Sequence, residues 1–297
     1  MLIIESPHEL QLLAKQWRCE GAGIGFVPTM GALHEGHLTL ARRARAENAR
    51  FIASVFVNPT QFGPNEDLKQ YPRPFERDCE LLREAGCDAI FAPSIEAMYG
   101  NTTDEQTHAN GAHNHIPQTW VEVSKLGEIW EGVVRPGHLR GVATVVAKLF
   151  NIVMPQRAYF GEKDYQQLKV IEHLVRDLHY DIEIVGVPTV READGLALSS
   201  RNAYLAPDER EAAVLLFQAL KHGAELAAGG ERDVAKLGEA MQEICERDAL
   251  VAVQYIAIVD AETLAPLGDL NESPARALIA ARVGSTRLID NIAITVA

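Results

Sequence analysis

Apolar runs alternate with helix-length segments along the first two thirds of the chain. Residues 51–57 form a nearly continuous apolar run, which is typical of a strand buried on both faces of a sheet. Between such runs, apolar residues recur at helical spacing, as in residues 10–17 after the capping box Ser6-Pro7-His8-Glu9. These patterns predict, in chain order, helix 7–18, strand 24–28, helix 36–48, strand 51–57, strand 88–92, helix 141–153, strand 157–160, helix 164–178 and strand 182–187.

Strands that alternate with helices require crossover connections, which are right-handed and join parallel strands. The pattern changes near Pro188, after which two helices precede three clustered apolar runs. We predict helices over 207–227 and 233–248, and strands over 253–259, 277–283 and 288–294. The expected fold class is therefore α/β: a Rossmann-like, doubly wound parallel sheet in residues 1–187, with a smaller C-terminal α+β lid domain in residues 188–297.

The composition is that of a globular protein, since the 297 residues are 47% hydrophobic and 23% charged. No apolar run reaches the ~18 residues of a membrane span, and the N-terminus lacks the basic region of a signal peptide, so we expect no membrane partner.

The net charge of −13 argues against nucleic acid as a partner but allows local cations around a phosphate. The four cysteines form no C-x-x-C pair, as expected of reduced thiols in a cytoplasmic protein.

In sheets of this kind ligands bind at the carboxyl ends of the strands, so the segments that follow strands are the candidates for chemistry. Residues 28–37, Pro-Thr-Met-Gly-Ala-Leu-His-Glu-Gly-His, follow a strand and open a helix. The helix N-terminus favours phosphate, and His34 and His37 share one helical face from which they can donate hydrogen bonds to it. Alternatively, one histidine caps the helix and the other packs locally. A zinc site is less favoured because no third ligand is visible.

Three further segments occupy equivalent places after predicted strands or near the domain boundary. Residues 58–63, Asn-Pro-Thr-Gln-Phe-Gly, carry amides that can orient a hydroxyl or carboxylate, or they form a plain Asn-Pro turn. Residues 160–167 place Lys163 after a strand and a glycine, where a phosphate contact is favoured over a merely solvated lysine. Residues 198–202, Leu-Ser-Ser-Arg-Asn, can bind phosphate oxygens and close as a lid, although Ser-Ser-Arg alone is common.

A polar segment, residues 101–118, interrupts the α/β pattern. It contains His108, His113 and His115, and it is typical of a surface loop or hairpin. These histidines could bind a metal, but no carboxylate or cysteine framework fixes such a site. Solvated side chains are therefore the favoured interpretation.

Taken together, these motifs resemble those of the pantothenate synthetase (pantoate–β-alanine ligase) family, within the HIGH-motif nucleotidyltransferase superfamily. His34-Glu35-Gly36-His37 is similar to the HIGH motif, and Leu198-Ser199-Ser200-Arg201 is similar to the mobile K-M-S-K-S loop. Residues 56–63, 135–138 and 161–167 also resemble family strings, so the resemblance covers nearly the whole chain in order. The clearest departure is residues 108–117, which look like an insertion.

The resemblance implies a reaction in two steps. ATP and (R)-pantoate give pantoyl adenylate and pyrophosphate, and the amine of β-alanine then attacks the adenylate to give pantothenate and AMP. It also implies Mg²⁺ with the ATP, a homodimer and a cytoplasmic location.

The resemblance further implies a role for individual residues. Contacts to ATP are expected from Met30, Gly31, Ala32, Leu33, His34, Glu35, Gly36, His37, Gly161, Glu162, Lys163, Asp164, Val190, Leu198, Ser199, Ser200 and Arg201. The expected catalytic residues among them are His37, His34, Lys163 and Arg201, with the last two on phosphate oxygens. Val190 matches a backbone contact to adenine, and His37 matches a residue usually assigned as a proton donor, although we interpret both histidines as stabilising the phosphates. Gln61 and Gln167 match pantoate contacts, Gln61 also touching β-alanine, and Asp78 matches a residue that helps to hold Mg²⁺.

Two other functions stay open at this point. One is another adenylyl-transferring enzyme, such as a mononucleotide adenylyltransferase, although the strings around Gln61 and Gln167 favour pantoate. The other is a non-catalytic nucleotide-binding module. The joint presence of His37, Lys163 and Arg201 argues against it, since binding alone would not need all three.

Overall fold

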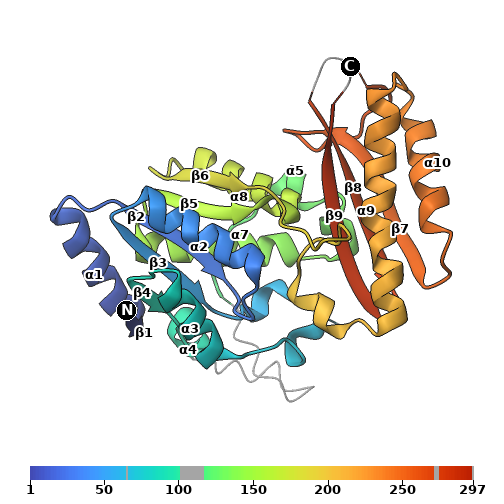
Figure 1. Cartoon of the computed structure of the whole chain (residues 1–297). Helices are drawn as coiled ribbons and strands as arrows, with labels where there is room; N and C mark the ends of the chain where they lie inside the picture. The colour runs from blue at the N-terminus through green and yellow to red at the C-terminus, as the bar shows by residue number, and fades with distance from the viewer. Residues whose placement is uncertain (65, 101–116, 271–273, 296–297) are drawn as a thin grey trace. The chain divides into compact units, whose positions relative to one another are not determined.

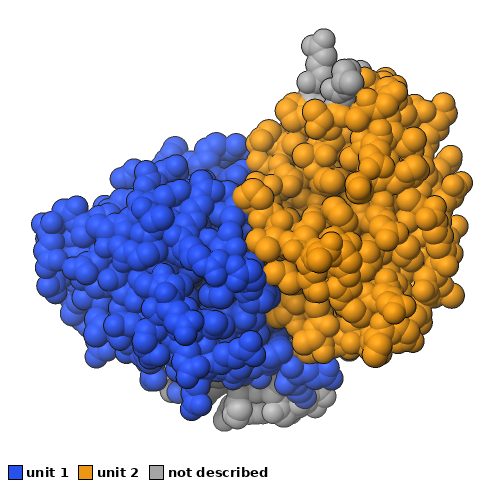
Figure 2. Space-filling view, in the orientation of Figure 1, with its two compact units in different colours: residues 1–161, 170–187 blue, residues 162–169, 188–297 orange. Residues whose placement is uncertain are grey.

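The computed structural model describes residues 1–64, 66–100, 117–270 and 274–295 (Figure 1). The chain divides into two compact units, which Figure 2 distinguishes by colour. Unit 1 comprises residues 1–161 and 170–187, and unit 2 comprises residues 162–169 and 188–297. The sequence pattern places residues 162–169 with the first domain, whereas their contacts group them with the C-terminal residues. The three histidines of the polar segment lie outside the described residues.

Unit 1 is built on a six-stranded parallel sheet with the strand order β1-β4-β3-β2-β5-β6. Its strands are β1 (Leu2–Ile4), β2 (Ile24–Thr29), β3 (Arg50–Val55), β4 (Ala89–Phe91), β5 (Arg157–Gly161) and β6 (Glu183–Val187). Every pairing is parallel, with Phe26 of β2 opposite both Ile52 of β3 and Ala158 of β5. The strand order reverses between β2 and β5, so their carboxyl ends form the switch point at which ligands bind in such sheets.

The helices of unit 1 pack through their apolar faces. They are α1 (Pro7–Cys19), α2 (Glu35–Glu47), α3 (Phe75–Glu84), α4 (Ile95–Tyr99), α5 (Ser124–Gly127), α6 (Glu131–Val134), α7 (His138–Val153) and α8 (Tyr165–Asp177), with the 3₁₀ turns η1 (Pro59–Gln61) and η2 (Asp67–Lys69). The first residues of α8 belong to unit 2. Helices α2 and α3 share a core cluster with Val27, Phe51 and Tyr159 of the sheet, while α1 and α7 contact each other and β2.

Unit 2 combines two helices with an antiparallel sheet. Its elements are η4 (Glu162–Asp164), η5 (Ser200–Tyr204), α9 (Pro207–Ala228), α10 (Val234–Cys245), β7 (Val251–Asp260), β8 (Ala275–Val283) and β9 (Thr286–Ile294). The sheet order is β7-β8-β9 with both pairings antiparallel, so β9 is an edge strand. Leu220 of α9, Met241 of α10 and Ile279 of β8 are fully buried in one core that joins the helices to the sheet.

The structure confirms the predicted fold class, a doubly wound parallel sheet followed by a smaller α+β part. The hydrophobic pattern missed β1, α3 and the shorter helices α4, α5 and α6. The side chains of Leu2 and Ile3 on β1 are exposed, so this strand lacks the pattern of a buried strand. Helix α3 has buried Cys79 and Leu82 at helical spacing but starts after Pro74 with no side-chain cap, so its N-terminal signal is what the sequence lacks. In the described part of the chain, no helix has both the length and the apolar character needed to cross a bilayer.

Candidate active site

The loop between β2 and α2 has a backbone conformation that few residues tolerate. Gly31 and Ala32 are consecutive residues in the left-handed region, with φ of 84° and 51°. The carboxylate of Asp78 accepts hydrogen bonds from the N–H groups of Ala32 and Leu33, both at 2.9 Å. A Cβ atom on Gly31 would lie 2.8 Å from Asp78 Oδ2, so glycine is what allows the carboxylate to approach. The strained loop is therefore held in place by one buried side chain.

Asp78 lies in the first turn of α3 and is only 1% exposed. Burial raises the pKa of its carboxyl group, while the two hydrogen bonds from the loop act in the opposite direction. Both carboxylate oxygens of Asp78 thus accept hydrogen bonds from the loop. The magnesium role that the resemblance implies for Asp78 stays a prediction. Among the residues that the structure describes, no group of three or more His, Cys, Asp or Glu side chains could hold a metal ion. These residues therefore do not form a protein cage for Mg²⁺.

The two histidines that follow this loop form a reciprocal cap on α2. His34 is the N-cap residue, and its Nδ1 accepts from the N–H of Gly36 at 3.2 Å. The Nδ1 of His37 accepts from the N–H of His34 at 3.3 Å, and the two ring centroids are 4.1 Å apart. Because both Nδ1 atoms are acceptors, the N–H group of each ring is on Nε2. Capping thus fixes the orientation of two N–H donors at a helix N-terminus. The Glu35 side chain between them is exposed and pairs with Arg42.

Asn58 and Gln61 form a buried pair of amides at η1. They are 1% and 8% exposed. Asn58 Nδ2 donates to Gln61 Oε1 at 3.1 Å and to the carbonyl of Gly141 at 3.3 Å, and Asn58 Oδ1 accepts from the Tyr99 hydroxyl at 2.7 Å. Gln61 Nε2 lies 2.9 Å from Met30 Sδ. This last contact brings a residue predicted to bind pantoate against a residue predicted to bind ATP.

The segment 135–138, which the sequence analysis matched to a family string, supports this amide pair. His138 Nδ1 lies 2.8 Å from the carbonyl oxygen of Gln61. Burial and the nearby charge of Arg135 lower the pKa of His138 to about 4, so the ring is neutral at pH 7 and its Nδ1–H donates to that carbonyl. Arg135 itself forms a two-pronged ion pair with Glu66, both contacts at 2.7 Å.

Lys163 and the Ser-Ser-Arg segment belong to unit 2. The Lys163 side chain is 20% exposed, and its Nζ lies 3.4 Å from Asp164 Oδ1. Ser199 caps η5, because its Oγ accepts from the N–H of Arg201 at 3.2 Å. Lys163 and Ser199 line the same small cavity within unit 2, together with Asn202 and Asp290. The structure thus brings these two predicted phosphate-binding segments together.

Val190 and Leu198 are paired in a short hairpin that leads into Ser199. The Leu198 N–H donates to the Val190 carbonyl at 3.0 Å, and Arg191 pairs with Ala197 as an antiparallel bridge. This pairing places Val190 beside the start of the Ser-Ser-Arg segment.

The predicted site residues fall into two groups. Gln167 is half-buried at the start of α8 and belongs to unit 2, whereas Gln61 belongs to unit 1. The group in unit 1 consists of Met30, Gly31, Ala32, Leu33, His34, Glu35, Gly36, His37, Gln61, Asp78 and Gly161, and the group in unit 2 consists of Glu162, Lys163, Asp164, Gln167, Val190, Leu198, Ser199, Ser200 and Arg201. No sequence pattern assigns a role to Tyr99, Glu66 or Asn291, because their partners lie far away along the chain.

A family model described as pantoate-beta-alanine ligase matches residues 2–293. The pantothenate synthetase of Rubrobacter xylanophilus is 60% identical over 292 residues, which cover 98% of each chain. That of Thermotoga neapolitana is 50% identical over 98% of this chain and 99% of the relative. These relatives match this chain from end to end.

Solved structures agree with the sequence relatives. The pantothenate synthetase of Thermus thermophilus matches with a TM-score of 0.88 and 49% identity, covering 99% of both chains. A pantoate-beta-alanine ligase of Francisella tularensis, solved as a complex with beta-gamma ATP and beta-alanine, matches with a TM-score of 0.77 and 33% identity over 99% of this chain and 97% of that one. With the family model, the sequence relatives and the solved structures in agreement over nearly its full length, this chain belongs to the pantoate–β-alanine ligase family.

Proposed function

We propose that this chain condenses (R)-pantoate with β-alanine at the expense of ATP, through a pantoyl-adenylate intermediate. In the first step a carboxylate oxygen of pantoate attacks the α-phosphorus of ATP, and the bond to pyrophosphate breaks. In the second step the amine of β-alanine attacks the acyl carbon, and AMP leaves with the carboxylate oxygen. The difficulty of the first step is that an anion approaches an anionic phosphate while negative charge moves onto pyrophosphate.

The contact between Gln61 and Met30 is the observation that carries this proposal. It joins the amide pair, which suits the hydroxyl and carboxylate groups of pantoate, to the loop that opens α2. The Nε2–H groups of His34 and His37 are the donors that this loop offers to phosphate oxygens. Since their orientation is fixed by the helix cap, these donors stabilise the developing charge without reorganising. We assign them hydrogen-bond donation, and transfer of a proton from His37 is not required.

In unit 2, Lys163, Ser199, Ser200 and Arg201 are proposed to bind the phosphates of ATP. A lysine ammonium supplies a compact charge, whereas a guanidinium presents a fork of donors to phosphate oxygens. The backbone of Val190 is proposed to contact adenine, and Gln167 is proposed to contact pantoate. The shared cavity of Lys163 and Ser199 supports a common role for their two segments.

Three further properties are proposed on the strength of the family resemblance: Mg²⁺ as a companion of ATP, assembly as a homodimer, and a cytoplasmic location. Magnesium in nucleotide enzymes is commonly held in large part by the phosphates themselves. That mode suits a chain whose described residues offer no ligand cluster.

Exchange of labelled pyrophosphate into ATP tests the proposed route. We expect exchange that requires pantoate and proceeds without β-alanine, because the first step is then reversible by itself. Exchange that depends on a mononucleotide instead would identify another adenylyltransferase. Folded protein that binds ATP but catalyses no exchange would contradict the adenylate route.

A further inference from the structure

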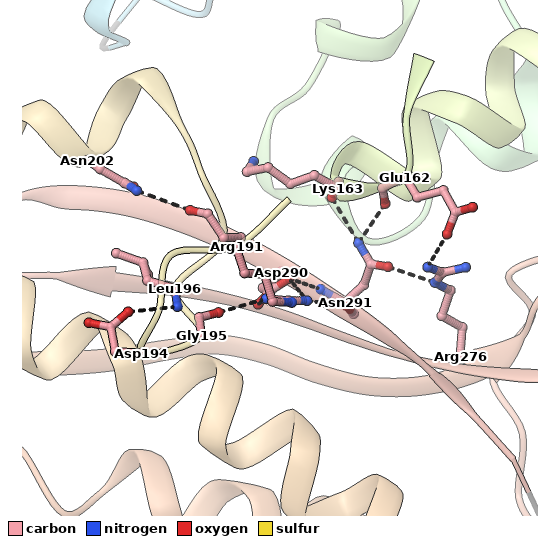
Figure 3. A network of polar contacts seen from close by, with 11 residues as sticks. Glu162, Lys163, Arg191, Asp194, Gly195, Leu196, Asn202, Arg276, Asp290 and Asn291 are labelled. Carbon is pink, nitrogen blue, oxygen red and sulfur yellow. Dashed lines mark hydrogen bonds and ion pairs between the residues drawn. The ribbon is translucent and has the colours of Figure 1, made fainter. Parts of the chain in front are cut away.

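Two consecutive residues of the edge strand β9 contact the Lys163 turn and the hairpin that leads into the Ser-Ser-Arg segment of unit 2 (Figure 3). Asp290 is 5% exposed and Asn291 is 3% exposed. Buried polar side chains at such positions need hydrogen-bond partners. Their partners lie in two stretches that are distant in sequence, the turn at Glu162 and Lys163 and the hairpin 190–198.

Asn291 holds the main chain of the Lys163 turn. Its Nδ2 donates to the carbonyl oxygens of Glu162 and Lys163, both at 2.9 Å. Its Oδ1 accepts from Arg276 Nε at 2.7 Å, which fixes the orientation of the amide. Arg276 in turn donates to the Glu162 carboxylate at 2.9 Å and lies over the Tyr165 ring. The Asn291 side chain therefore determines the backbone from which the Lys163 side chain projects.

Asp290 holds the hairpin that leads into Ser199. Its carboxylate forms a two-pronged ion pair with Arg191, at 2.6 and 2.9 Å. Arg191 also donates to the carbonyl of Gly195 at 3.1 Å and lies over the Phe217 ring at 4.1 Å. A Cβ on Gly195 would approach Phe217 to 2.1 Å, and the φ of Gly195 is 99°, so the hairpin has little freedom to take another shape. Asp290 thus anchors a tightly packed turn.

We propose that Asp290 and Asn291 are positioning residues, which hold Lys163 and the segment leading to Arg201 in the conformation that binds the phosphates of ATP. This inference rests on the proposed phosphate-binding roles of Lys163 and Arg201. The amide of Asn291 is suited to the task because its NH₂ group donates to two carbonyl oxygens while its Oδ1 accepts from Arg276. By fixing the main chain, the pair lowers the conformational entropy that would otherwise be lost when ATP binds.

The variant Asn291→Asp tests the proposal most directly, because it keeps the shape of the side chain but turns an acceptor toward two carbonyl oxygens. We expect the rate of pantoate-dependent pyrophosphate exchange to fall by about 10- to 100-fold, as for a displaced catalytic group. The KM for ATP should rise. The KM for pantoate, measured in the same assay, should rise less than the KM for ATP. If this variant does not fold by circular dichroism, the uncharged Asn291→Ser replaces it, with the same expected direction.

Thr286→Val is the matched control. Thr286 lies on the same strand, and its buried hydroxyl has no hydrogen-bond partner in the described structure. This variant should exchange pyrophosphate at the wild-type rate.

A double variant separates positioning from a merely structural effect. Affinity for a non-hydrolysable ATP analogue is measured by calorimetry in wild type, Asn291→Asp, Lys163→Ala and the double variant. If Asn291 acts through Lys163, Asn291→Asp should weaken binding several-fold in the wild-type background but less than about twofold when Lys163 is absent. Equal losses in both backgrounds, or wild-type exchange and KM for ATP in folded Asn291→Asp, would overturn the inference. Normal exchange by Lys163→Ala would instead refute the proposed role of Lys163.

Discussion

The two regions of this chain that are proposed to bind phosphate are held in place in opposite ways. In unit 1 the loop at Gly31 is held by the carboxylate of Asp78, which accepts hydrogen bonds from two main-chain N–H groups. This loop leads directly into helix α2. In unit 2 the turn at Lys163 is held by an amide that donates to two main-chain carbonyl groups. In the proposal, the first region supplies N–H donors that the cap of α2 orients, and the second supplies the Lys163 ammonium on a backbone that Asn291 holds. An amide suits the second region, because an ionised carboxylate has no N–H group to donate to main-chain carbonyl oxygens.

The largest expected effect comes from removing the donor or the cation itself. His37→Ala and Lys163→Ala should each leave the fold intact and lower the rate of adenylation by roughly 10²–10³-fold, the typical cost of one lost donor to developing charge. Pyrophosphate exchange measures that rate. Lys221→Ala, on the exposed surface of α9, is the control and should exchange normally. A near-normal exchange rate in either variant would show that the replaced side chain does not act on the phosphates, and its region would then not be a phosphate-binding region.

A smaller effect is expected from Asp78→Asn, which weakens the anchor of the first region without changing its size. One of the two N–H groups of the loop would face an NH₂ group, so we expect a loss of about 1–3 kcal/mol in the free energy of unfolding, together with slower exchange. Glu76→Gln, in the same turn of α3 but exposed, is the control for stability.

The Asp78 variant also separates positioning from metal binding. If Asp78 acts on the loop alone, the concentration of Mg²⁺ that gives half-maximal exchange should not change. A large rise in that concentration would support the magnesium role of Asp78. It would also mean that Asp78 is not solely an anchor of its loop, as Asn291 is proposed to be for the Lys163 turn.

The smallest effect concerns pH and the support of Gln61 by His138 in unit 1, since the Asn291 amide that holds the Lys163 turn does not titrate. The pKa of His138 is about 4 in the folded chain and ~6.5 when unfolded, so its contribution to stability is complete above pH 6.5 and is lost as pH falls toward 4. Between pH 7 and pH 5 this amounts to about 1–2 kcal/mol. His138→Asn should reduce the pH dependence of the free energy of unfolding by that amount. Denaturant titrations with the same pH dependence as wild type would contradict the assignment.

Local sequence signals were sufficient to predict much of the fold and to select the candidate site residues, whose chemical roles stay predictions. The β2 strand, Gly31 and the histidine pair are consecutive, so their arrangement follows from strand, turn and helix preferences. The His34 cap shows that the two interpretations of the histidines are compatible, because the cap orients the donors.

The anchors could not be predicted, because their contacts are distant in sequence. Asp78 is 46 residues from Ala32, and Asn291 is 128 residues from Lys163. The same cause explains the grouping of residues 162–169 with unit 2. Tyr165 donates to the carbonyl of Ala261 at 2.9 Å, and such tertiary contacts leave no periodic pattern in the sequence.

The most direct test of the adenylate route follows the carboxylate oxygen of pantoate. Pantoate labelled with oxygen-18 in its carboxylate is converted to pantothenate with ATP and β-alanine. The masses of the nucleotide products are then measured by mass spectrometry. We expect AMP that carries one labelled oxygen, since that oxygen bridges carbon and phosphorus in pantoyl adenylate. Unlabelled AMP, or ADP with the label in inorganic phosphate, would contradict it.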